Sequence, residues 1–431
     1  MLFKKSDTRF LTYAIIAAFG TYFCMYAFRK PFTVATYEGE HFWGVDYKIA
    51  LIIAQVLGYM LSKFLGIRLI SELKNTRRAL YILTLIGLAE ISLIIFAVVP
   101  APYNIVFMFF NGLPLGLIWG IVFSYLEGRR LTEFLGLALC SSFIVSSGVV
   151  KSIGLSVMLW FGVGEFWMPA VTGAIFLLPL LFFTRLLEKI PGPTSGDIRL
   201  RNERIPMTRA DRKQVLRMFW FPLVVLVFFY TFLTAFRDFR DNFSRELWDA
   251  LGFQGDASVY TLAELPVAFL VLGILSLMGL VRDNFKAFTG YHYLLLTGVT
   301  AIGLGTFLFQ LKILGPWLWM VVVGFGLYLA YVPFNCIFFD RMVAAFRTRG
   351  NAGYLIYIAD SFGYLGSILV LLYKNFGQAS ISWMSFFIYG SYGIAVLGGM
   401  AVLSSLAYFK YRQKQTKDIH LHNLHLHGKE V

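Results

Sequence analysis

Long apolar segments recur along this chain, and short polar stretches separate each from the next. A membrane-spanning helix needs about 20 mostly apolar residues, and twelve segments meet that requirement. The pattern therefore predicts an all-α integral membrane protein with twelve transmembrane helices. We predict spans at residues 10–34, 47–68, 79–99, 104–125, 134–160, 167–185, 216–238, 258–280, 289–310, 316–340, 352–373 and 382–408.

The longest polar interruption, over residues 186–215, divides the spans into six and six. We expect an N-terminal six-helix bundle over residues 1–185 and a C-terminal six-helix bundle over residues 216–408. The segment 186–215 is then a cytoplasmic central loop, and residues 409–431 form a cytoplasmic tail. Two related bundles with a substrate site between them are the common plan of secondary transporters.

Composition supports a membrane protein and narrows its chemistry. Apolar residues make up 58% of the chain and charged residues 14%, whereas soluble domains carry about 25% charged residues. Cys24, Cys140 and Cys336 are scattered through apolar segments, a pattern that predicts neither a disulfide framework nor a zinc site. No convincing nucleophile, metal set or acid–base constellation is present, so we expect no enzyme activity, no cofactor and no metal site.

The net charge of +14 is explained by the distribution of the 38 Lys and Arg residues. If the N-terminus is cytoplasmic, 28 of them fall on the cytoplasmic side and four on the opposite side. This bias follows the positive-inside rule and predicts that both termini are cytoplasmic. It leaves no support for nucleic-acid binding. We expect an inner (plasma) membrane protein of bacterial type, with a retained first span in place of a signal peptide.

Six basic residues remain within or at the ends of the predicted spans. A charge at the bilayer centre costs about 2.5–3.5 kcal/mol on insertion scales, so such groups should face a cavity or a partner. For the two in the first span, snorkelling to the interface is the alternative. We expect the last of the six to face the outer mouth together with Asp238. The six residues are Arg29, Lys30, Lys63, Lys151, Arg237 and Arg240.

Helical spacing places several of these charges on polar stripes, because residues three, four or seven apart share one helix face. The stripes predict a cavity lined by Tyr hydroxyls and a few charges. They comprise Tyr22, Tyr26 and Arg29; Gln55, Tyr59 and Lys63; Tyr230, Thr234, Arg237 and Asp241; Tyr260 and Glu264; Tyr328, Tyr331 and Asn335; and Asp360 and Tyr364.

The charges on these stripes point to a small anionic substrate in a lipid-embedded carrier. A guanidinium matches phosphate or carboxylate in bidentate fashion, so Arg29 and Arg237, supported by Lys63, would form a clamp with one arginine from each half. An empty clamp of like charges is unfavourable, which favours obligatory exchange. We expect Lys30, Lys151, Asp241, Glu264 and Asp360 to serve coupling or charge balance, with Glu264 a counter-ion.

Six motifs in chain order resemble those of one transporter family. They are Tyr22, Tyr26 and Arg29-Lys30-Pro31-Phe32 in the first span; Gly58-Tyr59-Met60-Leu61-Ser62-Lys63-Phe64 in the second; Gly116 and Trp119 in the fourth; Tyr260-x-x-x-Glu264 in the eighth; Tyr331-Val332-Pro333 in the tenth; and Phe362-Gly363-Tyr364-Leu365-Gly366 in the eleventh. Together they resemble the organophosphate:phosphate antiporters of the major facilitator superfamily, which include glycerol-3-phosphate and hexose-phosphate transporters.

This resemblance implies the major facilitator fold and the exchange of a phosphate- or phosphonate-bearing anion for inorganic phosphate. It also implies which residues bind the substrate, in a carrier that we expect to work as a monomer. For the arginine of the seventh span, Arg240 is the alternative to Arg237. The expected substrate-binding residues are Arg29, Lys63, Arg237, Tyr22, Tyr26, Tyr59, Trp119, Tyr331 and Tyr364.

The sequence also departs from the family pattern, and the departures keep other functions open. The family's substrate-binding His in the fifth span falls near Val145, and neither Lys151 nor Asp360 has a counterpart. Asp360 could make the protein a proton-coupled symporter or efflux carrier, and a transporter-like sensor would bind the same ligand without net flux. In the tail, His420, His422, His425 and His427 could bind metal, although polar chain ends are more often disordered.

Overall fold

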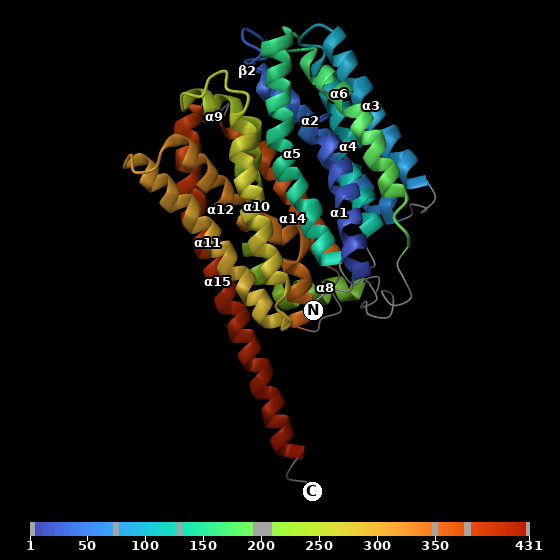
Figure 1. The fold of residues 1–431 in the computed structure, drawn as a ribbon. Helices are drawn as coiled ribbons and strands as arrows, with labels where there is room; N and C mark the ends of the chain where they lie inside the picture. The colour runs from blue at the N-terminus through green and yellow to red at the C-terminus, as the bar shows by residue number, and fades with distance from the viewer. Residues whose placement is uncertain are drawn as a thin grey trace.

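The computed structural model describes residues 5–71, 77–126, 132–192, 209–346, 352–374 and 381–427. Within them the chain folds into long helices that pack side by side (Figure 1). The first group is α1 (Lys5–Tyr26), α2 (Tyr47–Ser71), α3 (Arg78–Val98), α4 (Ile105–Leu126), α5 (Thr132–Phe161) and α6 (Met168–Glu188). The second group is α8 (Arg209–Asn242), α10 (Val259–Gly279), α11 (Asn284–Gln310), α12 (Pro316–Cys336), α14 (Ala352–Leu372) and α15 (Trp383–His427).

Short elements connect the long helices. A 3₁₀ helix, η1 (Pro31–Val34), follows α1, and an antiparallel hairpin of β1 (His41–Phe42) and β2 (Val45–Asp46) precedes α2. The helix α9 (Ser244–Ala250) follows α8, and α13 (Phe338–Ala345) follows α12. The hairpin and α9 lie at one end of the bundle, which we call the hairpin end (Figure 1). At the opposite end, the termini end, α1 begins and α15 projects beyond the other helices (Figure 1).

The expected all-α membrane architecture is confirmed. Ten of the described helices are long and apolar enough to cross a membrane. The helices α1 and α14 take the places of the predicted first and eleventh spans. Many large apolar side chains are exposed on the outer surface of the bundle, as expected where lipid is the solvent.

Several predicted span boundaries differ from those of the observed helices. The first helix ends at Tyr26, and the amides of Arg29 and Lys30 both donate to the Tyr26 carbonyl, at 3.0 and 2.9 Å. Lys30, the residue before Pro31, keeps helical angles of φ −105° and ψ −22°, so the chain leaves α1 through a tight turn that runs directly into η1. The predicted span over residues 316–340 is broken at Ile337, after Pro333, into α12 and α13.

The seventh span begins earlier than predicted, because α8 starts at Arg209. Within α8, Phe219 has non-helical angles of φ −122° and ψ 22°. Pro222 lies three residues further on in the same helix. The proline ring clashes with the preceding turn and removes one helical hydrogen bond, so α8 is kinked where it enters the bundle.

Small residues set the closest helix contacts inside each group. In the first group, α2 packs on α4, where Gly58 faces the Phe109 carbonyl and Gly112 faces the Gln55 carbonyl. In the second group, Gly298 of α11 faces Gly326 of α12. Glycine lets two backbones approach closely in a lipid-embedded bundle. The two groups meet along α5 with α10 and along α2 with α14.

Candidate functional site

A cavity lies between the two helix groups, with an empty volume of about 500 Å³ that includes open solvent. Its walls come from the turn after α1 and from α1, α2, α4, α5, α8, α12 and α14. All nine residues that the sequence predicts to bind substrate lie on its wall, namely Arg29, Lys63, Arg237, Tyr22, Tyr26, Tyr59, Trp119, Tyr331 and Tyr364. Cys140, Phe143, Asn335, Ile356 and Asp360 complete the lining. Five tyrosines in one small cavity make its wall aromatic and rich in hydroxyl groups.

Arg29 is the most unusual cation of this cavity. Its side chain is buried, with a relative exposure of 7%, and its guanidinium carbon lies 3.9 Å from the centre of the Tyr59 ring. Among the described residues Arg29 has no ion pair, and its Nε atom has no hydrogen-bond partner. A ring face attracts a cation but does not satisfy N–H donors. An anion in the cavity would therefore be stabilised beside Arg29.

A hydrogen-bonded network fixes the backbone that carries Arg29. Gln55 Nε2 donates to the Arg29 carbonyl at 2.9 Å and to Asn111 Oδ1 at 2.7 Å. Asn111 Nδ2 donates to the carbonyls of Phe28 and Ala89, at 2.9 and 3.1 Å. The carbonyls that have no helical partner after the end of α1 thus accept hydrogen bonds from Gln55 of α2 and Asn111 of α4. Sequence reasoning missed Asn111, although an Asn buried in a strongly apolar helix is a signal of such a role.

Arg237 lines the same cavity, but in a different electrostatic state. Its guanidinium carbon lies 4.1 Å from the centre of the Tyr331 ring, and its Nη2 atom is 2.6 Å from Asp238 Oδ1. Asp238 is buried and also accepts a hydrogen bond of 2.7 Å from Ser367. The expectation that Asp238 faces an outer mouth is therefore wrong. The two arginines do not form a pair of equal free charges, because Asp238 neutralises Arg237.

Asp360 brings a negative charge to the cavity wall. Its Oδ1 atom accepts a hydrogen bond of 2.6 Å from the Tyr230 hydroxyl, and Asn335 Oδ1 lies 3.2 Å from the same hydroxyl. The Tyr230 ring stacks on Tyr331 with its centre 5.3 Å away. No described residue forms an ion pair with Asp360, so it is not a counter-ion in this part of the chain.

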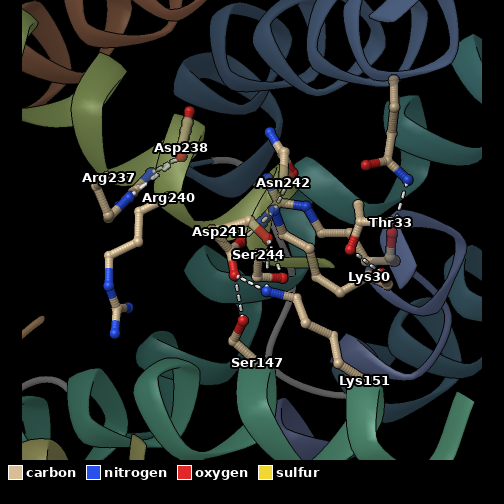
Figure 2. A network of polar contacts seen from close by, with 12 residues as sticks. Lys30, Thr33, Ser147, Lys151, Arg237, Asp238, Arg240, Asp241, Asn242 and Ser244 are labelled. Carbon is tan, nitrogen blue, oxygen red and sulfur yellow. Dashed lines mark hydrogen bonds and ion pairs between the residues drawn. The ribbon is translucent and has the colours of Figure 1, made fainter. Parts of the chain in front are cut away.

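A second polar cluster lies towards the hairpin end, where Asp241 forms ion pairs with both Lys30 and Lys151 (Figure 2). Ser147 donates to the same carboxylate, and Lys30 Nζ donates to Asn242 Oδ1 at 2.8 Å. Lys30 is buried, so the alternative that it snorkels to the interface is wrong. Lys151 finds its acidic partner on α8, in the other helix group.

Arg240 pairs with Glu264, with Nη1 to Oε1 at 2.6 Å, and donates to the Met320 carbonyl at 3.2 Å. This contact confirms Glu264 as a counter-ion. Arg240 is buried, so its expected place at an outer mouth is wrong. With Lys151, Asp241 and Glu264, it lines a second, smaller cavity. Of the two arginines considered in the seventh span, Arg237 lines the larger cavity.

Further contacts join the two groups at the hairpin end. Lys48 pairs with Glu246 at 2.5 Å, and Arg245 donates to the Val34 carbonyl at 2.9 Å. With the cluster around Asp241, these contacts connect the two groups at the hairpin end. Nearer the cavity, Tyr59 of α2 meets Tyr364 of α14, with ring centres 5.2 Å apart.

Some predictions lie outside the described residues. They concern most of the central loop, residues 193–208, together with the side chains of the four tail histidines. Within the part that is described, no group of three or more His, Cys, Asp or Glu side chains is placed to hold a metal ion.

Comparison with solved structures places the fold among secondary transporters. The chain resembles a nucleoside transporter, NupG, with a TM-score of 0.60 and 15% identity over 93% of this chain and 99% of that chain. A D-xylose-proton symporter gives a TM-score of 0.57 and 14% identity over 92% and 96%. A POT family transporter in complex with 5-aminolevulinic acid gives 0.57 and 16% over 93% and 96%.

These three proteins are transporters and none is an enzyme, in line with the expectation for this chain. The shared fold is of the major facilitator type, which confirms the expected fold class. No match was found among curated protein sequences. One family model, described as a family of unknown function (DUF5690), matches residues 31–412.

Proposed function

The chain belongs to the DUF5690 family, and for this membrane protein we propose the function of a secondary transporter that moves a small organic anion by alternating access. The substrate binds in the cavity between the helix groups.

The observation that carries the proposal is Arg29, a buried guanidinium on the cavity wall without an ion pair among the described residues. A buried charge is costly unless it is paired, so this site favours an anion as its ligand. The planar guanidinium fork matches a phosphate or phosphonate group. The tyrosine hydroxyls and Lys63 supply further donors around the same group.

Exchange for inorganic phosphate follows from the same electrostatics. Without an anion, the uncompensated charge of Arg29 disfavours a state in which the cavity is closed from both sides. A bound phosphate or organophosphate removes that penalty, so the loaded carrier crosses more readily than the empty one. The motif resemblance to organophosphate:phosphate antiporters supports this coupling mode.

The contacts at the hairpin end supply the closed side of an alternating-access cycle. Lys30, Lys151 and Asp241, with Lys48 and Glu246, hold the two helix groups together there. In the orientation we propose, the hairpin end faces the outside of a bacterial inner membrane and both termini are cytoplasmic. Each protein molecule then works as a monomer, with its substrate site between its own two halves.

Exchange in proteoliposomes tests the proposal. Vesicles loaded with phosphate are offered labelled glycerol phosphate, sugar phosphates, phosphonates and carboxylates. We expect uptake of at least one of these anions and its loss in Arg29→Ala. Unchanged uptake in both Arg29→Ala and Arg237→Ala would overturn the proposal. Binding without flux would instead assign a sensor function.

A second candidate, proton-coupled transport, is favoured by one observation. Asp360 lines the cavity, and no described residue forms an ion pair with it. A carboxyl group in such a place can bind and release a proton. A pH gradient would then drive uptake in the wild type and fail to drive it in Asp360→Asn. If a pH gradient does not change uptake and Asp360→Asn transports as well as the wild type, proton coupling through Asp360 is excluded.

A further inference from the structure

Asp360 and Asn335 present more acceptor oxygens than the Tyr230 hydroxyl can satisfy. The Tyr230 hydroxyl has one proton, yet both Asp360 Oδ1 and Asn335 Oδ1 lie within hydrogen-bond distance of it, at 2.6 and 3.2 Å. The amide nitrogen of Asn335 donates to the Tyr331 carbonyl at 3.3 Å, which holds the amide oxygen towards Tyr230. The second carboxylate oxygen of Asp360 adds another acceptor.

This acceptor cluster lies on one helix group, and Arg29 lies on the other. Asn335 and Asp360 belong to α12 and α14, whereas Arg29 follows α1. Arg237, which comes from the same group as Asp360, is neutralised by Asp238. The cavity is therefore polarised, with a positive wall on the N-terminal half and an acceptor-rich negative wall on the C-terminal half.

We propose that the transported anion also carries an amino group, so that the substrate class is a small zwitterionic amino-phosphonate or amino-organophosphate. The inference rests on the proposed function and adds a second recognition point to the same cavity. The anionic group is held by Arg29, and the ammonium group is held by Asp360 and Asn335.

The hydrogen-bond inventory fits this assignment. An ammonium group offers three N–H donors and no acceptor, which suits the surplus acceptors of Asp360 and Asn335. An analogue without the amino group leaves these acceptors unpaired, and a site built for an N–H group discriminates strongly against such an analogue. A substrate bound at both walls also bridges the two halves, which gives a reason for the loaded carrier to close around it.

A matched pair of phosphonates tests the inference in the proteoliposome assay. The probes are 2-aminoethylphosphonate and propylphosphonate, which differ by an amino group in place of a methyl group. We expect the wild type to take up the amino compound at least tenfold more efficiently. We expect Asp360→Asn to lose most of this preference, since Asn keeps the size of the side chain and an acceptor for Tyr230 but removes the charge.

Two further variants keep the test independent of folding defects. Asn335→Leu should reduce the preference in the same direction without changing a charge. Asp283→Asn is the matched control, because Asp283 is an exposed N-cap of α11 and Asn caps helices equally well. It should retain the full preference.

The outcomes separate this inference from the proposed function. Equal uptake of the two phosphonates by the wild type overturns the inference and leaves anion transport standing. If Asp360→Asn loses uptake of both phosphonates equally, the inference is also overturned, because a residue that only couples transport to protons does not discriminate between the two compounds. If neither phosphonate nor any other anion is transported, the proposed function itself fails.

Discussion

The guanidinium carbon of Arg29 lies 3.9 Å from the centre of the Tyr59 ring, on the wall of the cavity between the two halves. On the other half, Arg237 lies over Tyr331 at 4.1 Å in a similar arrangement. The two sites differ in one respect, because Asp238 pairs with Arg237 and no described acidic residue pairs with Arg29. The cation–π contact holds each arginine in place, but Arg29 alone presents an uncompensated charge.

The first prediction concerns the geometry of Arg29. Replacement by Lys keeps the charge but removes the planar fork and its stacking on Tyr59. We expect Arg29→Lys to lower kcat/KM for uptake about tenfold or more, a loss of at least about 1.4 kcal/mol. Arg29→Ala should lower it much further. Initial uptake rates into phosphate-loaded proteoliposomes measure both effects.

Arg282→Ala is the control for Arg29, because Arg282 is exposed and does not line the cavity. The Arg282→Ala variant should take up substrate at the wild-type rate. If Arg29→Lys transported as well as the wild type, charge alone would suffice and bidentate recognition would be wrong.

The second prediction separates the structural role of Arg237 from its role in binding. Arg237→Ala leaves the buried Asp238 with the hydroxyl of Ser367 as its hydrogen-bond donor among the described residues, and breaking a buried ion pair from one side costs about 3–5 kcal/mol. Adding Asp238→Ala removes the orphaned charge, so thermal stability in detergent should largely recover. We expect uptake to stay at least tenfold low in the double variant, since the cavity has lost a donor.

Recovery of uptake together with stability would contradict this expectation. Arg237 would then serve only to balance Asp238. The double-mutant cycle is informative because the two residues are in direct contact, where additivity fails by a measurable interaction energy.

The third prediction concerns the hairpin end, where Asp241 of α8 pairs with two lysines of the other half, Lys30 and Lys151 (Figure 2). Asp241→Asn leaves two buried lysines without their carboxylate, which disfavours the closed arrangement. We expect the hairpin end to open more often. Spin labels at Glu38→Cys and Gln254→Cys, two exposed loop positions at this end, should report a longer distance once Cys24, Cys140 and Cys336 are replaced.

Lys151→Met in the Asp241→Asn background provides the internal control. It removes one of the two unpaired charges, so part of the closed population should return. An unchanged distance distribution in Asp241→Asn would show that the cluster does not hold this end shut.

The sequence predicts the membrane helices well, because spanning length and apolar composition are local properties of each segment. The stripe of Gln55, Tyr59 and Lys63 also predicted correctly that two of its members line one cavity. The partners of Lys30 and Lys151 could not be found in this way. Helical spacing relates residues within one helix, whereas Asp241 reaches both lysines only when the two halves pack together.

The stripe on α8 shows the same limit. Tyr230 bonds to Asp360, Arg237 faces the larger cavity, and Asp241 belongs to the cluster at the hairpin end. The polar residues on one face of α8 therefore contact different partners at successive positions along the helix. The neutralisation of Arg237 by the adjacent Asp238 depends on side-chain direction, which a pattern of spacing does not give.

The last prediction concerns the packing that holds the Arg29 support in place. Gly112 of α4 lies directly against the Gln55 carbonyl of α2, and Gln55 is the residue whose amide bonds the Arg29 carbonyl. A methyl group at Gly112 would push the two backbones apart, so Gly112→Ala should destabilise the protein by about 1–3 kcal/mol. Uptake should fall as well, because the displaced Gln55 no longer fixes Arg29.

Gly87→Ala is the matched comparison, because a Cβ at Gly87 of α3 meets nothing within 4 Å. Alanine favours a helix over glycine by about 1 kcal/mol, so this variant should be as stable as the wild type or slightly more so. Thermal unfolding in detergent and uptake in proteoliposomes measure the two variants side by side. Equal behaviour of Gly112→Ala and Gly87→Ala would contradict a tight α2–α4 contact. A loss of stability without any loss of uptake would mean that Arg29 is positioned independently of Gln55.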